Sequence, residues 1–305
     1  MQKISTMQAC ESKNFQPGQL TVGLDLGDRW SFYCVLDESG KVILEQKLAT
    51  TPEATKQTFA KIPPSRIAME TGTHSPWVSR LLAELGHEVI VAHAQKVDLI
   101  TRSTRKDDRH DAKALARLVR IDPELLGPVR HRSAKAQIHL TVIRARAELV
   151  RVRTALVNAA RGSVKSYGER LPKRGTQQVS CKLGAGLSPE LREVLEPLFQ
   201  EIESLNERIK EYDRRIEQIA QQEYPESGPL KQVKGVGELI ALTYVLTIED
   251  PHRFRKSRDV GCFLGLQPGR RNSGESEPQM DISKAGRRVP TGAAGARSTL
   301  HFGTV

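Results

Sequence analysis

The sequence has few cysteines and no apolar stretch of the length that crosses a membrane. Its 305 residues include 4 cysteines, none in a CxxC pair or near a histidine at zinc-ligand spacing. No run approaches the roughly 18 consecutive apolar residues of a membrane span, and residues 1–19 lack the apolar core of a signal peptide. These absences predict a cytoplasmic protein with reduced, packed thiols, without a disulfide framework, a zinc site or a membrane partner.

Acidic residues are also fewer than basic ones. Lys plus Arg total 47 against 36 for Asp plus Glu, a net charge of +11. Between residues 102 and 174 there are 19 basic and 7 acidic side chains, so the rest of the chain is almost neutral. Residues 133–174 alone have 10 basic and 2 acidic side chains, too few acids for ordinary i,i+4 pairing on a solvated helix face. We therefore predict a phosphate-binding surface here and favour nucleic acid over an anionic membrane as the partner.

The length allows two domains and a small third module. After an extension at 1–19, predicted to be mobile, short apolar runs predict strands at 20–26, 30–36, 42–48, 66–70 and 88–92, a turn at 38–41, and helices at 52–61 and 76–85. Three strands in a meander followed by alternating helices and strands predict an α/β fold over 20–130, a mixed sheet with flanking helices. This is the order of ribonuclease-H-like, or RuvC-like, domains.

Two heptad-spaced apolar seams follow, over 131–224. The first is Ile138, Val142, Ala145, Leu149, Val152, Leu156 and Ala159, and the second is Ile202, Leu205, Ile209, Tyr212, Ile216 and Ile219. They predict two long helices that pair as an antiparallel coiled coil, joined by a mostly polar linker at 168–197. The alternative is two ordinary amphipathic helices packed on the domain. A small helical module begins at 225.

Two acids end predicted strands. Asp25 lies in Gly-Leu-Asp-Leu-Gly and Glu70 ends Arg-Ile-Ala-Met-Glu. A carboxylate among apolar residues costs several kcal/mol unless something such as a metal ion neutralises it. Asp108 and Asp111, three residues apart, share one face of a predicted helix that continues to Leu118. The four acids match the needs of a two-metal phosphoryl-transfer site. The alternative is that Asp107 or Asp108 caps the helix and Asp111 stabilises its dipole.

These acids carry a resemblance to a known family. Asp25 in GLDLG, Glu70 in METGTHSPW and the pair in KDDRHDAKALARL resemble the four acids of insertion-sequence transposases with a RuvC-like DEDD domain, the IS110 family. The resemblance covers about 20–288. The family pattern Lys-x-Asp-x-x-Asp-Ala falls on Asp108 and Asp111, which leaves Asp107 without a ligand role. The resemblance to this family implies that the four acids bind Mg²⁺ (or Mn²⁺).

The region 225–288 resembles the second catalytic module of these transposases. Val233-Lys-Gly-Val-Gly237 is similar to a helix-hairpin-helix turn, whose glycines, Gly235 and Gly237, let backbone amides approach phosphate. In the segment QPGRRNSGES at 267–276, the resemblance makes Ser273 the nucleophile, with Ser276 the weaker candidate. A serine needs an activator and charge stabilisation; the acid and metal cluster would supply the first, and Arg270 and Arg271 the second.

The resemblance implies a DNA transposase or recombinase that cuts and rejoins DNA, selects it through a structured noncoding guide RNA and works as a homo-oligomer, a dimer or tetramer. The basic helices would then hold RNA or DNA. The predicted nucleic-acid contacts are Arg144, Arg146, Arg151, Arg153, Arg161, Lys165, Gly235, Gly237, Arg270 and Arg271.

Three alternatives stay open. A RuvC-like junction nuclease would use only the four acids, metal and water. A sugar kinase or actin-like ATPase would share the GLDLG loop, but it needs a second phosphate loop and an adenosine motif, and the sequence contains neither. The third is a non-catalytic nucleic-acid-binding remnant.

The tail at 289–305 departs from the family pattern. It has no helical period, whereas a shift of one base from Val289 onward allows codons for a family-like apolar helix. We expect a frameshifted, truncated copy with a mobile Ser273 loop and weak or no activity.

Overall fold

The computed structural model describes residues 20–94, 96–97, 107–266, 268, 273–274, 276, 278, 280, 286–288 and 301–303. The predicted extension at 1–19 lies outside these residues. The chain divides into two compact units, Met1–His131 and Arg132–Thr304. The predicted boundary between 224 and 225, inside the second unit, stays a prediction. No helix among the described residues is long and apolar enough to cross a bilayer.

The first unit is built around a mixed sheet of five strands in the order β3-β2-β1-β4-β5. The strands are β1 (Thr21–Asp25), β2 (Trp30–Leu36), β3 (Val42–Ala49), β4 (Arg66–Glu70) and β5 (Glu88–Ala92). β1 to β3 form an antiparallel meander, while β4 pairs in parallel with both β1 and β5. The predicted mixed sheet is thus confirmed, and β2, β4 and β5 begin and end at the predicted residues.

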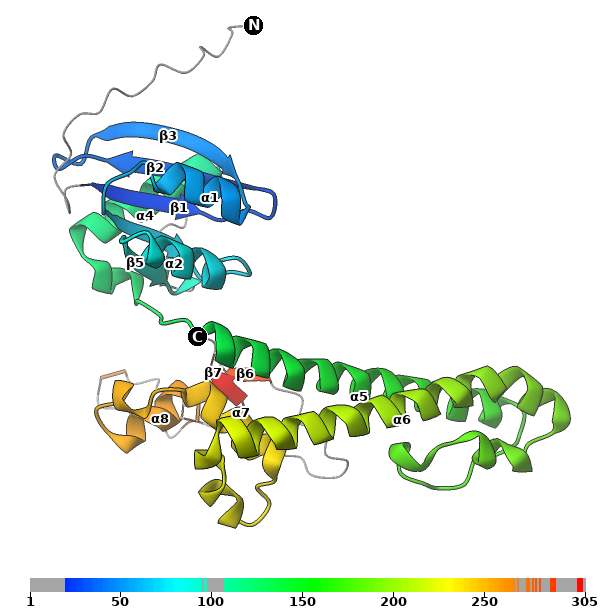
Figure 1. The fold of residues 1–305 in the computed structure, drawn as a ribbon. Coiled ribbons are helices and arrows are strands. Elements are labelled where there is room, and N and C mark those ends of the chain that lie inside the picture. Colours follow the sequence, from blue (N-terminus) through cyan, green and yellow to red (C-terminus); the bar gives the residue numbers. More distant parts are fainter. Residues whose placement is uncertain are drawn as a thin grey trace, which may run out of the picture. The chain divides into compact units, whose positions relative to one another are not determined.

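Helices cover both faces of the sheet (Figure 1). α1 (Pro52–Phe59) and α2 (Ser75–Glu84) pack on one face through Phe59, Val78 and Leu82. α4 (Asp108–Ile121) packs on the other face, followed by the 3₁₀ turn Pro123–Leu126. Since side chains alternate along a strand, the inner strands β1, β2 and β4 contribute to two apolar layers, which explains their mostly apolar sequences. The edge strand β3 has the polar run Glu45-Gln46-Lys47 and is mostly exposed.

Helix α4 approaches β1 more closely than any side chain would allow. A Cβ atom built on Gly23 would lie 1.9 Å from the backbone oxygen of Ala112 and 2.5 Å from the backbone nitrogen of Ala116. The small residues Ala112 and Ala116 are themselves buried. Glycine is therefore required at position 23 by the helix that crosses it.

The second unit contains two long antiparallel helices, α5 (Ala134–Ser166) and α6 (Pro189–Glu223). Their polar contacts join Lys135 to Glu223, Arg146 to Asp213 and Arg153 to Asn206, so the residue numbers rise along one helix as they fall along the other. α7 (Glu238–Ile248) packs against both, with Leu242 and Leu246 in a shared core (Figure 1).

The buried seam of α6 is as predicted, but the predicted seam of α5 is wrong. Of its predicted members only Val142 is buried; Ile138 is 60% exposed and Val152 39%. The buried stripe of α5 is Ala136, Leu140, Ile143, Ala147, Arg153, Val157, Ala160 and Val164, with Val142 beside it. The buried stripe thus interrupts its large apolar residues with alanines and an arginine, which breaks the heptad pattern of large apolar residues.

The predicted linker at 168–197 is too long. It contains two 3₁₀ turns, Thr176–Gln178 and Cys181–Gly186, and α6 already begins at Pro189. Pro197 lies inside α6, where its missing N–H and its ring usually break a helix. Here Pro197 is exposed, while Leu195 and Phe199 beside it are buried, and this packing offsets the cost.

The remaining described elements are short. Turns at Pro225–Ser227, Pro229–Gln232 and Pro251–Arg253 flank α7, and α8 (Ser257–Phe263) follows. β6 (Gly286–Arg288) pairs antiparallel with β7 (His301–Gly303). Cys34, Cys181 and Cys262 are free thiols, and Cys10 lies outside the described residues. Cys34 is packed as predicted, Cys181 is half-buried, and Cys262 is exposed, so the prediction of a packed thiol is wrong for Cys262.

Replacing Gly23 with alanine should destabilise the folded protein, because α4 packs directly against the backbone of β1 at this residue. The new methyl group meets backbone, which cannot rotate away, so the free energy of unfolding should fall by about 1–3 kcal/mol or more, as in overpacked cores. Urea unfolding followed by circular dichroism measures this. Gly72→Ala is the control, because its Cβ meets nothing within 4 Å. Equal midpoints for both variants would contradict the required close approach.

Candidate functional site

The candidate site begins with Asp25, the last residue of β1. Its side chain is half-buried, and its antiparallel partner on β2 is Phe32. On the other side, β1 and β4 run in parallel with Leu24 beside Met69, so the next residues, Asp25 and Glu70, end adjacent strands at one edge of the sheet. Strand register therefore brings together two acids that are 45 residues apart in the sequence.

Helix α4 contributes the other two acids from its first turn. Asp107 is the N-cap and accepts a hydrogen bond from the Arg109 backbone N–H at 3.2 Å; its carboxylate also contacts His110 at 3.2 Å. These bonds hold the pKa of Asp107 below its usual range. Asp107 thus serves as the cap, which leaves Asp108 and Asp111 available to face the sheet.

The electrostatics show that the four acids share one region. Burial, followed by the negative charges of Asp108, Asp111 and Glu70, raises the pKa of Asp25 from 3.8 to about 6, while the Leu26 backbone N–H opposes the shift. Like charges raise a carboxyl pKa only when they are close enough to repel it. The folded chain thus holds an excess of negative charge around Asp25.

An oxygen-only set of donors with excess negative charge fits a hard divalent cation such as Mg²⁺. Within the described part of the chain, however, no three His, Cys, Asp or Glu side chains stand close enough to form a ready metal-binding group. Convergence of the four acids on one point therefore stays a prediction.

Sequence reasoning missed a polar link beside these acids. His74 Nε2 lies 3.7 Å from Asp28 Oδ1, and Trp77 Nε1 donates to His74 Nδ1 at 3.1 Å. Asp28 follows β1 and His74 follows β4, so the contact joins the two loops that leave Asp25 and Glu70. The only sequence signal was the spacing of His74 and Trp77 at the start of a helix.

Ser273 and Ser276 flank a tight turn. The Ser273 N–H and carbonyl exchange hydrogen bonds of 3.1 Å with those of Ser276, and Gly274 has a φ of +58°. Such turns place glycine where φ is positive. Both serines are exposed. Arg270 and Arg271 lie outside the described residues.

Gly235 and Gly237 form an exposed turn before α7. Gly235 has a φ of +90°, which favours glycine, and Gly237 is the N-cap residue of α7. The element before this turn is the short 3₁₀ segment Pro229–Gln232.

The predicted basic contacts on α5 divide into two groups. Arg144, Arg151 and Lys165 are exposed and Arg161 is half-buried; Arg151 pairs with Glu148, and Arg161 donates to the Arg174 carbonyl.

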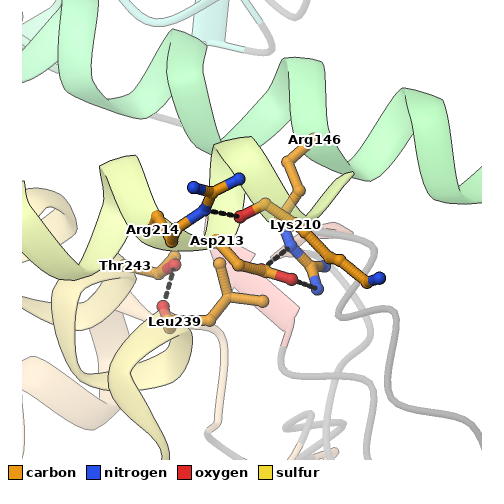
Figure 2. A network of polar contacts seen from close by, with 6 residues as sticks. All are labelled: Arg146, Lys210, Asp213, Arg214, Leu239 and Thr243. Carbon is orange, nitrogen blue, oxygen red and sulfur yellow. Dashed lines mark hydrogen bonds and ion pairs between the residues drawn. The ribbon is translucent and has the colours of Figure 1, made fainter. Parts of the chain in front are cut away.

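Arg146 and Arg153 instead belong to the interior of the helix pair, which corrects their predicted place on an exposed phosphate surface. The Arg146 side chain is 13% exposed and its Nε lies 2.5 Å from Asp213 (Figure 2). Arg153 is buried and donates to Asn206 Oδ1 at 2.9 Å, and burial lowers its pKa. Both guanidinium groups thus bind side chains of α6.

Two family models match the chain. The model DEDD_Tnp_IS110, described as a transposase, matches residues 22–168, and the model of the transposase IS116/IS110/IS902 family matches 228–304. The first match contains all four acids and the second contains Ser273. The chain belongs to the IS110 family of transposases. The second match includes most of the tail that we expected to depart from the family.

Curated relatives agree with this assignment. The transposase for insertion sequence element IS1111A of Coxiella burnetii is 29% identical over 87% of this chain and 73% of its own length. A probable family 20 transposase of Pseudomonas aeruginosa is 28% identical over 87% and 79%. The solved structure of Thermus thermophilus RuvC aligns with 32% of this chain and 90% of its own, at 16% identity and a TM-score of 0.24, too low for a comparison of folds.

The transposase is therefore an enzyme of DNA transposition, with DNA as its substrate, and its DEDD domain implies dependence on a divalent metal ion. Family membership excludes the sugar-kinase or ATPase alternative.

The raised pKa of Asp25 predicts how stability depends on pH without metal. Between about pH 4 and pH 6 the folded protein keeps a proton that the unfolded chain has released, so stability should fall as the pH rises through this window and stay low above it. Asp25→Asn should remove this loss. In EDTA, its melting temperature should exceed that of the parent at about pH 7 and approach it at about pH 4.

Asp107→Asn is the matched control. Asparagine caps helices as well as aspartate does, and the pKa of Asp107 is lowered rather than raised. This variant should therefore gain no stability at neutral pH. Equal melting temperatures for Asp25→Asn and the parent at pH 7 would show that the acids do not repel one another.

Proposed function

We propose that this transposase cuts and rejoins DNA at a site formed by Asp25, Glu70, Asp108 and Asp111, with Ser273 as the covalent nucleophile. The observation that carries the proposal is the pKa of Asp25, which three acids from β4 and α4 raise together with burial. A fold that gathers like charges destabilises itself, and such perturbed groups mark functional sites.

The four carboxylates are suited to hold Mg²⁺ (or Mn²⁺), because Asp25 and Glu70 end rigid strands and the other two lie on the first turn of α4. A bound divalent ion would supply charge neutralisation and polarisation of phosphate oxygens. The protein groups fix where the scissile phosphate lies and accept protons at their carboxylate oxygens.

The serine explains how phosphodiester energy is kept between cutting and rejoining. Ser273 Oγ bonds to phosphorus as the bond from phosphorus to one strand's oxygen breaks, and the hydroxyl proton passes to a base of the acid cluster. The serine ester that results is later attacked by a DNA hydroxyl. Support comes from the exposed turn that presents Ser273 and from its match to the family module. Arg270 and Arg271 are proposed to stabilise the phosphorane charge.

The α5–α6 pair is proposed to be an antiparallel coiled coil that supports a homodimer or tetramer and holds RNA or DNA. α5 contains seven basic residues and one acid, whereas α6 contains five basic residues and ten acids. The phosphate surface is therefore proposed on the exposed side of α5, with further backbone contacts at Gly235 and Gly237. Selection of DNA by a guide RNA remains part of the proposal.

We keep the shifted reading frame from Val289 as a proposal. Of the tail, the structure describes only β7, which pairs with β6 just before the tail. The nucleotide sequence around codon 288 tests it directly, because an intact helix in the neighbouring frame is either present or absent.

A metal-dependent junction nuclease and a non-catalytic remnant remain alternatives to the serine mechanism. The first would be indifferent to Ser273, and the second would cleave no DNA.

The serine mechanism predicts a protein–DNA adduct on denaturing gels once the family-like frame is restored after Arg288, and a weak adduct or none with the present chain. Asp25→Asn should abolish both cleavage and adduct while nucleic-acid binding persists. Ser273→Ala should abolish the adduct, whereas Ser276→Ala should retain it.

Asp107→Asn is the control for a charge change near the acids and should retain activity, because asparagine still caps α4. Cleavage without an adduct, or an adduct that persists in Ser273→Ala, would establish the plain nuclease instead. Loss of binding in Asp25→Asn would indicate misfolding.

The basic side of α5 predicts salt-dependent binding. Changing Arg144, Arg151 and Lys165 together to glutamine should reduce the log–log salt slope by about 2–3, since each phosphate contact contributes about 0.7–0.9. The control is the same charge change at three exposed residues of α6, Arg208, Lys210 and Arg214, which should leave the slope unchanged. Filter binding of a labelled oligonucleotide at several salt concentrations measures both. Equal slopes for the two triple variants would place the phosphate surface elsewhere.

A further inference from the structure

An exposed tryptophan lies on the same face of the sheet as the four acids. Trp30 begins β2 and is 53% exposed. Asp25 is directly opposite Phe32 in the antiparallel register, and alternation along β2 places Phe32 and Trp30 on one face. Phe32 packs on α4, which identifies this as the α4 face. Trp30 is thus diagonal to Asp25, at a Cα separation on the order of 8 Å.

The ring of Trp30 stands among basic groups. Lys47, opposite Phe32 on β3, has its Nζ 4.9 Å from the centre of the indole ring. Arg29 precedes Trp30 and is exposed. Apart from the four acids around Asp25, the acids Glu45 and Asp28 have basic partners: Glu45 contacts Lys113 at 3.9 Å and Asp28 contacts His74. Lys47 and Arg29 therefore supply positive charge beside the ring, which suits the phosphates of a ligand that also has flat apolar groups.

The loop that presents Trp30 is rigid. Gly27 turns so tightly that a Cβ would lie 2.3 Å from the Trp30 carbonyl oxygen. Thr50 Oγ1 donates to the Gly27 carbonyl at 2.9 Å, and the Thr50 N–H donates to the Arg29 carbonyl at 3.0 Å. The Ser31 hydroxyl bonds the same threonine hydroxyl at 2.8 Å. A pre-ordered ring loses little entropy when a partner stacks on it.

We propose that Trp30 stacks on a base of the DNA strand that enters the carboxylate site, with Arg29 and Lys47 against its phosphates. Exposed aromatic rings beside cationic side chains bind single-stranded nucleic acid in this way. DNA is the occupant because the ring shares its face and its end of the sheet with the acids assigned to DNA cleavage. The inference rests on that proposed site, and it names the residue that positions the strand there.

The test uses the full chain in EDTA, so that binding is measured without cleavage. The protein has 2 tryptophans, Trp30 and Trp77. A short single-stranded DNA oligonucleotide should quench tryptophan fluorescence in the parent, and Trp30→Phe should lose this quenching while it keeps the stacking surface. Trp30→Ala should bind the oligonucleotide about tenfold more weakly, as expected when one base–aromatic stack is lost, and Trp30→Phe within about threefold of the parent.

Ile121→Ala is the matched control, because Ile121 is 72% exposed at the opposite end of α4 from the acids. It should bind and quench like the parent. Undiminished quenching in Trp30→Phe, or parental affinity in Trp30→Ala, would overturn the proposal. An RNA oligonucleotide of the same sequence that quenches Trp30 as strongly as DNA, or more so, would also overturn it, by assigning the ring to RNA.

Failure of this inference is distinguishable from failure of the proposed site. If Asp25→Asn abolishes cleavage but Trp30 is insensitive to DNA, only the stacking proposal is wrong. If Trp30 responds to DNA but Asp25→Asn still cleaves, the carboxylate site is wrong and the ring no longer positions a strand for it.

Discussion

The direct contact between α4 and the backbone of β1 is the constraint on which the candidate site depends. Gly23 lets the helix lie against the strand at Ala112. That depth sets where the first turn of α4, with Asp108 and Asp111, stands relative to Asp25. A larger residue at position 23 would lift the helix, and the acids of α4 with it, away from the end of β1.

The same packing forces four negative charges into one region. Asp25 is half-buried and is repelled by the negative charges of the other three acids. At neutral pH the folded protein is therefore less stable than it would be with an amide at this position. The proposed metal site would therefore be held at a cost in stability. The penalty is offset by the apolar layers on both faces of the sheet, where Leu24 and Ile67 on the α1–α2 side and Leu36 and Leu115 on the α4 side are almost fully buried.

In the second unit, the two long helices have different roles. α6 provides most of the acids and a seam of large apolar side chains, whereas α5 provides alanines mixed with larger apolar residues on its buried side and most of its basic residues outward. Arg146 and Arg153 are the exception, because Asp213 and Asn206 contact them across the pair. Figure 2 shows the contact of Arg146 with Asp213. Loss of Asp213 would leave the partly buried charge of Arg146 without its partner, so this ion pair favours the observed alignment of the two helices.

The sequence alone determined the strands and helices of the first unit, because short apolar runs, turn residues and helix caps are local signals that survive in one dimension. It also proposed the four acids from the spacing of their motifs, and their role as a metal site stays a prediction. It also determined the seam of α6, whose residues are uniformly large and apolar. It failed for the seam of α5, since an arginine is buried there only when Asn206 stands opposite, and for the start of α6, since the packing of Leu195 and Phe199 overrides Pro197. Only the tertiary structure decided that three acids raise the pKa of Asp25 and that Trp30 lies on the same face of the sheet as Asp25. Both facts depend on strand register and helix depth, which arise from contacts between residues far apart in the chain.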